Sequence, residues 1–321
     1  MRIGIGLWCL QSTATAPRSL LRAHRELIDD ALLAERVGLD SIWLSEHHGF
    51  YDGYSPALLP VASAALTATD RLRVGTGVLL LPLQRPERVA AGAAELHRLS
   101  GGRFELGMGM GYRPVEFAAK DLVMADRRTR MEAGLDALAE QFAGEPGGGP
   151  PLWVGVTSTA AARRAGRRGL GLFISGAFSK AVVDELVAAH REAWLVAGQP
   201  GGDESPPVGL LRNLWVADGQ AERRQALDWV RSSYLVYAGL GWGAADTGVD
   251  FASQIEASMD EVEASALVGG PDEVAEQLAA YTDVDLVVCR IGYDAPPRSA
   301  LTEVIERIGV EVAPLLAGAG R

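Results

Sequence analysis

Short apolar runs alternate with longer amphipathic stretches along most of this chain. Eight apolar runs are typical of strands: Ile3–Leu7, Ser41–Ser45, Arg73–Leu81, Arg103–Met108, Leu152–Val156, Gly171–Ile174, Val208–Val216 and Leu286–Ile291. Helical patterns separate or follow them at Ser19–Val37, Ser55–Ala68, Pro86–Leu99, Arg127–Phe142, Lys180–Ala197, Ala221–Ala238, Asp272–Tyr281 and Ser299–Leu316. Strands that alternate with helices predict a parallel sheet with right-handed crossovers. Eight of them favour closure into an α/β fold of the (β/α)8 TIM-barrel type.

Two segments depart from this alternation. The stretch Gly144–Pro151, rich in glycine and proline, is short and indicates a connection between a helix and the next strand. The glycine-rich stretch Gly239–Glu263 follows the seventh strand and its helix. We expect an insertion there, which is either a lid or pocket wall or a plain surface loop. No shift in composition marks a second domain, so residues 1–321 are expected to form a single domain.

The strand Ser41–Ser45 ends in a carboxylate and two imidazoles, Glu46, His47 and His48, followed by Gly49. In a parallel α/β fold the carboxyl ends of the strands form the edge where ligands bind. Histidine titrates near neutral pH, which suits proton transfer. The sequence therefore predicts a functional site here, although a polar strand end that caps the next helix has the same pattern.

Glycines occupy one face of two predicted strands. Gly75 and Gly77 alternate with apolar residues in the third strand, as Gly107 and Gly109 do in the fourth. If the bulky face meets the outer helices, the glycines line the barrel interior and hollow its mouth, so that a flat ligand can approach the backbone. A dinucleotide-binding fingerprint at Gly107–Gly111 is the alternative, but no helix begins directly after this G-x-G-x-G spacing.

Composition and charge narrow the classes of function. The 321-residue chain is 48% hydrophobic and 22% charged, as in a soluble protein with a large core. Its formal net charge of −11 argues against nucleic acid and anionic membranes as partners, because both favour basic surfaces. The chain has no apolar run of roughly 18 residues and no leader-like start, so we expect a cytoplasmic protein. Cys9 and Cys289 lie in apolar runs, and we expect no metal site.

Several short motifs follow one another along nearly the whole chain. They are Trp43–His48 (WLSEHH), Gly75–Pro82 (GTGVLLLP), Leu99–Phe104 (LSGGRF), Gly109–Pro114 (GMGYRP) with Glu116–Phe117, Leu152–Gly155 (LWVG) with Thr157–Thr159, and Val268–Asp272 (VGGPD). With these motifs the chain resembles the bacterial luciferase-like monooxygenases, a superfamily of flavin- and deazaflavin-dependent barrel enzymes. The resemblance implies an eight-stranded barrel with the flavin at the carboxyl-end mouth.

The resemblance also implies roles for single residues. His47 matches a histidine that acts in proton transfer beside the flavin. Glu46 and His48 match its neighbours, which either share in the catalysis or instead orient the imidazole or shape the pocket. The implied cofactor-binding positions are Gly77 and Val78, joined by a cis peptide against which the isoalloxazine stacks, Thr157 and Ser158 at the phosphate, and Ser175 and Gly176 behind the ring. Arg163 and Arg164 in the helix after Ser158 either add positive charge at the phosphate or belong to a solvated helix face. Gly109 and Met110 stand where luciferases place a cysteine and an arginine near the flavin. Arg113 is then either a substitute phosphate clamp or the partner of Glu116.

The implied function is that of a flavin-dependent monooxygenase. It uses reduced FMN, supplied by a separate reductase, and O2 to oxidise a small organic substrate. One alternative is hydride transfer by a deazaflavin-dependent oxidoreductase on the same barrel, although the Glu-His-His signature favours FMN; another is a non-catalytic flavin-binding protein. The resemblance further implies a homodimer packed through Ser55–Ala68 and Pro86–Leu99, whose Ala and Leu residues suit close helix packing; the alternative is that both helices simply bury these residues against the barrel. The sequence does not identify the substrate, because the pocket is set by loops.

Overall fold

A closed parallel barrel forms the centre of the computed structural model, which describes residues 1–8, 17–49, 55–144, 148–198, 205–239, 259–291 and 296–318. The strands are β1 (Arg2–Trp8), β2 (Ser41–Leu44), β3 (Arg73–Thr76), β4 (Leu79–Leu80), β5 (Phe104–Gly109), β6 (Leu152–Val156), β7 (Gly171–Ile174), β8 (Val208–Val216), β9 (Leu267–Gly269) and β10 (Leu286–Arg290). The ring runs β1-β2-β3-β5-β6-β7-β8-β10, and β10 pairs with β1 to close it. The predicted eight-stranded (β/α)8 barrel is confirmed.

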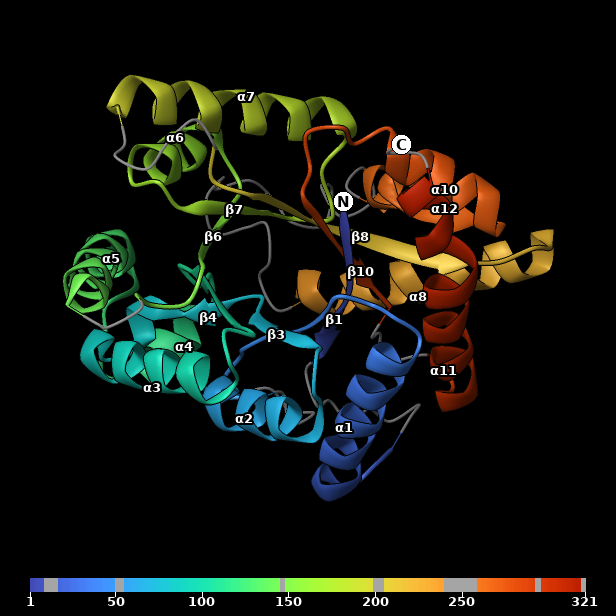
Figure 1. Cartoon of the computed structure of the whole chain (residues 1–321), viewed down its shortest axis with the longest axis horizontal. Coiled ribbons are helices and arrows are strands. Elements are labelled where there is room, and N and C mark those ends of the chain that lie inside the picture. The colour runs from blue at the N-terminus through green and yellow to red at the C-terminus, as the bar shows by residue number, and fades with distance from the viewer. Residues whose placement is uncertain are drawn as a thin grey trace.

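Helices surround this barrel (Figure 1). They are α1 (Leu20–Arg36), α2 (Leu58–Ala68), α3 (Pro86–Leu99), α4 (Pro114–Ala118), α5 (Arg127–Ala143), α6 (Thr159–Arg167), α7 (Lys180–Ala197), α8 (Gln220–Gly239), α10 (Pro271–Ala279), α11 (Arg298–Arg307) and α12 (Ala313–Gly318). Helix α1 shows how they form: the Ser19 hydroxyl accepts the Arg22 N–H, and Ala23, Leu27 and Ala31 bury one face. Spacing of four residues places these apolar side chains in one stripe against the barrel.

Some boundaries differ from the sequence-based expectation. The third predicted strand divides into β3 and β4, because the peptide between Gly77 and Val78 is cis and interrupts the ladder. The predicted cis peptide is therefore confirmed. A short 3-10 helix, Leu81–Leu83, follows β4, and a π-helical turn, Ile308–Val312, joins α11 to α12. Strand β9 was not predicted; it extends the sheet along β8 beyond the closed ring.

Aromatic side chains fill the middle of the barrel interior. The Trp43 ring stacks on Phe173 with centroids 5.0 Å apart and meets Trp153 edge-on at 5.9 Å. A Cβ added at Gly75 would lie 2.5 Å from the Trp43 ring, and one at Gly107 would overlap the β3 backbone with Trp43 3.5 Å away. The glycines do face the interior, but the expected hollow is wrong at Gly75 and Gly107, because the Trp43 indole occupies the space beside them.

The other face of β5 packs against the helices. Phe104, Leu106 and Met108 are fully buried, and they share one apolar core with Val89 of α3 and Leu138 of α5. Successive side chains of a strand point to opposite faces, so the alternation of bulky residues and glycines gives β5 a helix-facing side and an interior side.

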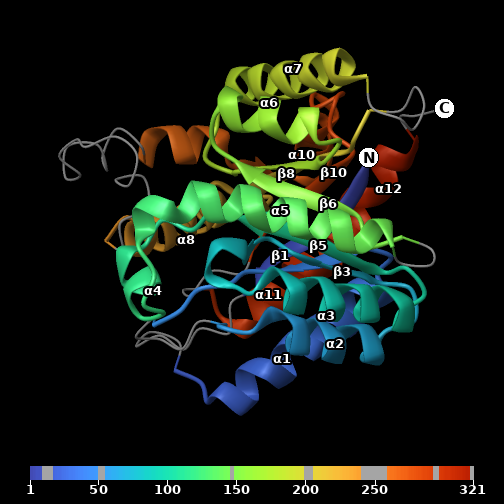
Figure 2. The same ribbon diagram turned by 90° about the vertical axis from the view of Figure 1, so that its left-hand side faces the viewer.

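The two ends of the barrel carry different polar groups. At the amino ends of the strands, Glu105 accepts hydrogen bonds from Arg2 at 2.8 Å, Arg73 at 2.5 Å and the Trp153 indole N–H at 2.8 Å. At the carboxyl ends lie the loop after β2 and helix α4. Figure 2 shows α4 at the end of the barrel opposite the label of the N-terminus. Ligands of parallel barrels bind at the carboxyl ends, so the candidate site lies at this mouth.

Two features singled out in the sequence lie wholly or mostly outside the described residues. Residues 240–258, which are most of the predicted insertion Gly239–Glu263, lie outside the described residues, as does Cys9. Among the helices of the described ranges, none is both long and apolar enough to cross a membrane. The same ranges contain no group of three or more His, Cys, Asp or Glu side chains arranged to hold a metal ion.

Candidate active site

The loop after β2 carries the predicted Glu46, His47 and His48 to the barrel mouth. All four residues of β2 are buried, so the strand is fixed in the core up to the point where the polar residues begin. The backbone N–H of His47 then donates to the carbonyl of Ser55 at 3.1 Å, which holds the loop against the start of the next segment. Glu46 and His47 are 2% and 6% exposed, so these polar groups need partners inside the protein.

Glu116 is the partner of His47. Glu116 lies in α4, whose N-cap is Arg113 and whose first residue is Pro114. Residues 110–112 connect this helix to the end of β5. Oε1 of Glu116 is 2.9 Å from Nδ1 of His47 and accepts the backbone N–H of His48 at 2.9 Å. Nη1 of Arg113 is 3.4 Å from the same oxygen and donates to the carbonyl of His48 at 2.8 Å. One carboxylate thus joins the loop after β2 to the segment after β5.

The electrostatic surroundings of Glu116 keep it ionised. Burial by itself raises the pKa of its carboxyl, but the hydrogen bond and charge of His47, the His48 N–H and the Arg113 cation together hold that pKa below its ordinary value. The side chain is 1% exposed. Its second oxygen, Oε2, has no hydrogen-bond partner within the described part of the chain. Oε1 therefore carries the hydrogen bonds that stabilise the charge.

Tyr112 faces the other ring nitrogen of His47. Its hydroxyl is 3.4 Å from Nε2, and the two rings meet edge-on with centroids 5.4 Å apart. Tyr112 is half-buried, whereas His47 is buried. The imidazole thus lies between a buried carboxylate and a partly exposed hydroxyl.

His48 and Glu46 form a second pair beside the first. Nε2 of His48 is 2.6 Å from Oε1 of Glu46, which also accepts from the Gln84 amide at 2.7 Å. The other oxygen of Glu46 accepts the backbone N–H of Leu80 at 2.8 Å. This pair ties the loop after β2 to strand β4, two residues beyond Val78. Its contacts orient the loop: the His48 ring contacts Glu46, while the His48 backbone N–H contacts Glu116.

Val78 forms an apolar surface at the mouth. It is half-buried and packs on the interior cluster that contains Trp43 and Trp153. A Cβ at Gly109 would collide with the Val78 side chain, and one at Gly155 would touch it at 3.4 Å. Two glycines on neighbouring strands therefore make room for this valine. Met110 follows Gly109 and was the other site residue predicted after β5; it lines the cleft between α5 and α6.

The predicted phosphate-binding residues lie at the start of α6. Thr157 and Ser158 are exposed, and Ser158 is the N-cap, with its hydroxyl accepting the Ala161 N–H at 3.4 Å. Ser158 thus satisfies one of the free N–H groups of this helix end, and the remaining ones stay available to an anion. Arg163 is on the outer side, 3.8 Å from Glu192, and both side chains are exposed.

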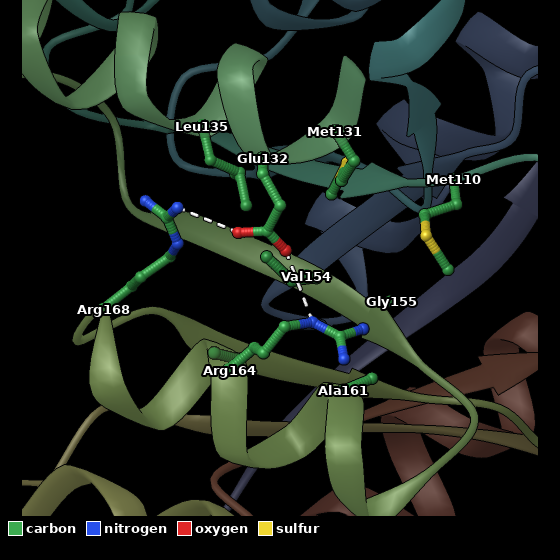
Figure 3. Close-up of a pocket in the computed structure, with 10 residues that line it drawn as sticks. Met110, Met131, Glu132, Leu135, Val154, Gly155, Ala161, Arg164 and Arg168 are labelled. Atoms are coloured by element: carbon green, nitrogen blue, oxygen red, sulfur yellow. Dashed lines mark hydrogen bonds and ion pairs between the residues drawn. The ribbon is translucent and has the colours of Figure 1, made fainter. Parts of the chain in front are cut away.

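Arg164 lines a pocket between α5 and α6 (Figure 3). Glu132 of α5 lies between Arg164 of α6 and Arg168, the C-cap of that helix, with Nε of Arg164 at 3.3 Å and Nη2 of Arg168 at 2.8 Å. Met110 and Gly155 line the end of this pocket that belongs to the barrel strands. Burial and the nearby Arg128 lower the pKa of Arg164, while Glu132 opposes them. Arg164, unlike Arg163, is thus directed toward the strand that carries Gly155.

Ser175 and Gly176 directly follow β7. They are the residues expected to lie behind the flavin ring. The carbonyl of Gly176 accepts from Nη1 of Arg212 at 3.2 Å and from the Ser265 hydroxyl at 3.1 Å. Arg212 is fully buried and also donates to the Tyr281 hydroxyl, at 2.9 and 3.1 Å. These bonds fix the loop from the helix side, while Ser175 itself is half-buried.

The structure brings the predicted residues into two groups. Glu46, His47, His48 and Val78 gather around the loop after β2, and Met110 lies with Arg164 and Gly155 near the start of α6. Arg113 contacts Glu116, which is one of its two expected roles, and its role at a phosphate stays a prediction. Glu116 and Tyr112 were not assigned to the site from the sequence. The Glu116–Phe117 motif next to Arg113 was the available signal.

A family model described as luciferase-like monooxygenase matches residues 1–285. The chain belongs to this family. The resemblance inferred from the motifs is thereby confirmed. Alignments with two curated relatives cover 65% and 30% of those proteins, so this chain spans less than two thirds of their lengths.

Three similar proteins illustrate the range of the family. The F420-dependent glucose-6-phosphate dehydrogenase of Beutenbergia cavernae is 27% identical, over 92% of this chain and 94% of that protein. The structure of the monooxygenase RslO1 from Streptomyces bottropensis is 24% identical, with a TM-score of 0.80 over 98% of this chain and 99% of that one. The oxygenating constituent of 3,6-diketocamphane monooxygenase from Pseudomonas putida, in complex with FMN, is 20% identical, with a TM-score of 0.79 over 98% of each chain. At these identities the two structures establish the fold alone.

Proposed function

We propose that this chain is a flavin-dependent monooxygenase that oxidises a small organic substrate with reduced FMN and O2, and that a separate reductase supplies the reduced FMN. The observation that carries the proposal is the buried His47–Glu116 pair at the barrel mouth, on a loop that Glu46 ties to Leu80 beside Val78. A proton-transfer group and an apolar stacking surface thus belong to one connected unit. Two of the similar proteins are monooxygenases, and one of these holds FMN.

The residues at the mouth fit a flavin. Val78 offers a half-buried apolar surface on which a flat ring can stack, and Gly109 and Gly155 leave no side chains beside it. The exposed start of α6 after Ser158 offers backbone N–H groups to a phosphate, and Arg164 lies on the same helix. When bound, the reduced flavin supplies the electrons with which O2 is activated.

The chain's own residues then position the substrate, limit water and move a proton. His47 exchanges a proton at Nε2, and Glu116 balances the positive charge that the imidazole gains. Glu46 and His48 hold the loop in place through Leu80 and Gln84. The 6% exposure of His47 limits its contact with bulk water, so its charge interacts strongly with its neighbours.

A deazaflavin-dependent oxidoreductase is the second candidate. The relative from Beutenbergia cavernae uses F420 and aligns with 92% of this chain, which favours this reading. The same histidine and carboxylate would then move a proton during hydride transfer. The paired histidines after β2 are the feature of this sequence that favours FMN.

Flavin titration of the whole chain separates the candidates. We expect saturable fluorescence changes with reduced FMN under anaerobic conditions, followed by O2 consumption when air is admitted. Binding of F420 with no binding of either FMN form would establish the second candidate instead, and binding of none of the three would refute both. Gly109→Ala should weaken FMN binding because its Cβ collides with Val78, whereas Gly219→Ala, with no atom within 4 Å of the added Cβ, is the matched control.

We also propose that the chain forms a homodimer through α2 and α3. Their outer faces expose Ala64, Ala68 and Ala91, small residues that allow close helix packing. Sedimentation at micromolar concentration should give twice the mass of one chain, and Ala64→Arg should restore the mass of the monomer. A monomer at all concentrations for the unmodified chain would refute this assembly.

A further inference from the structure

We propose that Glu116 is a positioning residue that fixes the proton of neutral His47 on Nδ1 and leaves Nε2 as the only proton acceptor of that ring. The role in catalysis rests on the function proposed above, whereas the position of the proton is a property of the protein without its cofactor. The sequence motifs placed His47 at the site and left Glu46 or His48 to orient its ring, but they did not give Glu116 this role.

The first step is the geometry around Oε1 of Glu116. Nδ1 of His47 and the backbone N–H of His48 both lie 2.9 Å from this oxygen, and Nη1 of Arg113 lies at 3.4 Å. An ionised carboxylate can only accept hydrogen bonds. Nδ1 must therefore carry a hydrogen, and the neutral ring has its lone pair on Nε2.

The second step concerns what else orients the ring. The His47 backbone is held by the carbonyl of Ser55, and the edge-on contact with Tyr112 limits rotation of the imidazole. The Tyr112 hydroxyl is 3.4 Å from Nε2 and is able to donate to a lone pair there. Both neighbours of the ring thus agree with a proton on Nδ1.

The third step separates positioning from support of the fold. Glu116 is 1% exposed, as is Glu105 at the opposite end of the barrel, so both are buried carboxylates that the fold has to accommodate. Glu105 accepts hydrogen bonds from two arginines and an indole. Within the described part of the chain, none of its hydrogen-bond partners is a histidine. If both glutamates only supported the fold, replacing either one would have the same effect on the position of the His47 ring proton. The proposed role predicts that only a change at Glu116 moves this proton.

The test is 15N NMR of the histidine rings in the full chain without flavin. Spectra are recorded at about pH 8.5, two units above the ordinary imidazole pKa, and the His47 signals are assigned by their loss in His47→Gln. We expect the pattern of an Nδ1–H ring in the unmodified chain. Glu116→Gln should keep it, because His48 N–H and Arg113 hold the amide oxygen at the Oε1 position. Glu116→Leu removes the acceptor and should shift the ring toward Nε2–H.

Glu105→Gln is the matched control, and it should leave the His47 signals unchanged. An Nε2–H ring in the unmodified chain overturns the proposal even if the Leu variant does not fold. The same Nδ1–H signals in a folded Glu116→Leu protein also overturn it, because another group would then set the proton. Flavin titration fails or succeeds independently of these spectra, so loss of the proposed function is distinguishable from loss of this inference.

Discussion

Glu105 and Glu116 are buried to the same extent, each 1% exposed, but they stand at opposite ends of the barrel with different partners. Arg2 and Arg73 surround Glu105, and arginine keeps its charge over the whole pH range of a folded protein. Glu116 is hydrogen-bonded to His47, and an imidazole, unlike a guanidinium, is able both to donate and to accept a proton. The ion-pair partners of Glu105 are arginines and hold structure, whereas Glu116 pairs with the His47 imidazole as well as with Arg113 and is therefore also able to support proton movement.

The direction of the pKa shift does not distinguish the two ends. Burial by itself raises the pKa of Glu105, but Arg2 and Arg73 outweigh it and hold that pKa below its ordinary value. Glu116 shifts in the same direction for a similar balance of causes. What differs is the chemistry of the partner. In this protein the proton-exchanging partner, and not the direction of the pKa shift, distinguishes the candidate site from the structural ion pair.

The largest expected effect is at the mouth. Replacing His47 by Ala should lower turnover by roughly 10²–10⁴, the usual cost of losing a general acid or base, and leave flavin affinity nearly unchanged. The reason is that backbone and phosphate contacts would hold the flavin. Product formation with a substrate of the unmodified enzyme and flavin titration measure the two quantities. His48→Ala should cost less, since His48 contacts Glu46. Near-full turnover of His47→Ala would contradict a proton-transfer role for the residues at the carboxyl-end mouth of the barrel.

At the other end, Glu105→Ala should affect stability without touching His47. Removing one partner of a fully buried ion pair costs about 3–5 kcal/mol, but solvent screens part of this interaction because Arg2 and Arg73 are 33% and 29% exposed. We expect a loss of about 2 kcal/mol in the free energy of unfolding, measured by denaturant titration. A change in the His47 NMR signals of this variant would show that the two ends are coupled after all.

Lowering the pH should weaken the contribution of Glu105. Its folded-state pKa lies below the ordinary value of a glutamate carboxyl, so its stabilisation is present above that ordinary value and is lost as pH falls through the folded pKa. The difference in unfolding free energy between the unmodified chain and Glu105→Gln should therefore narrow as pH falls from about 6 to about 3. Denaturant titrations at a series of pH values measure it. A difference that widens on acidification would have the wrong sign for a lowered pKa.

The smallest expected effect is that of Arg2→Gln. Arg73 remains at 2.5 Å from Glu105, and Arg2 is partly exposed, so we expect a loss of about 1 kcal/mol or less. Thermal unfolding should shift by a few degrees at most, with turnover unchanged. A loss as large as that of Glu105→Ala would mean that Arg2 alone balances this carboxylate.

Sequence patterns predicted the fold, and they predicted Glu46, His47 and His48 as site residues, but not Glu116 and Tyr112. Glycine alternation along β5 placed Gly107 in the barrel interior correctly, and the motif at Gly77–Val78 gave the cis peptide. The hollow expected beside Gly75 was wrong, since Trp43 comes from the neighbouring strand and fills it. The space that a glycine leaves is filled by other parts of the chain, and a local pattern does not contain them.

Local sequence patterns were enough to predict the barrel, its strand faces and the position of Glu46, His47 and His48 at a carboxyl end, because periodicity and chain direction are local properties. The tertiary structure decided which carboxylate meets which imidazole. Glu116 is 69 positions from His47, on a short helix after β5, with β3 between the two strands in the ring. Only the closed barrel brings these two loops together over the same mouth, since the curvature of the sheet turns its strand ends toward a common axis.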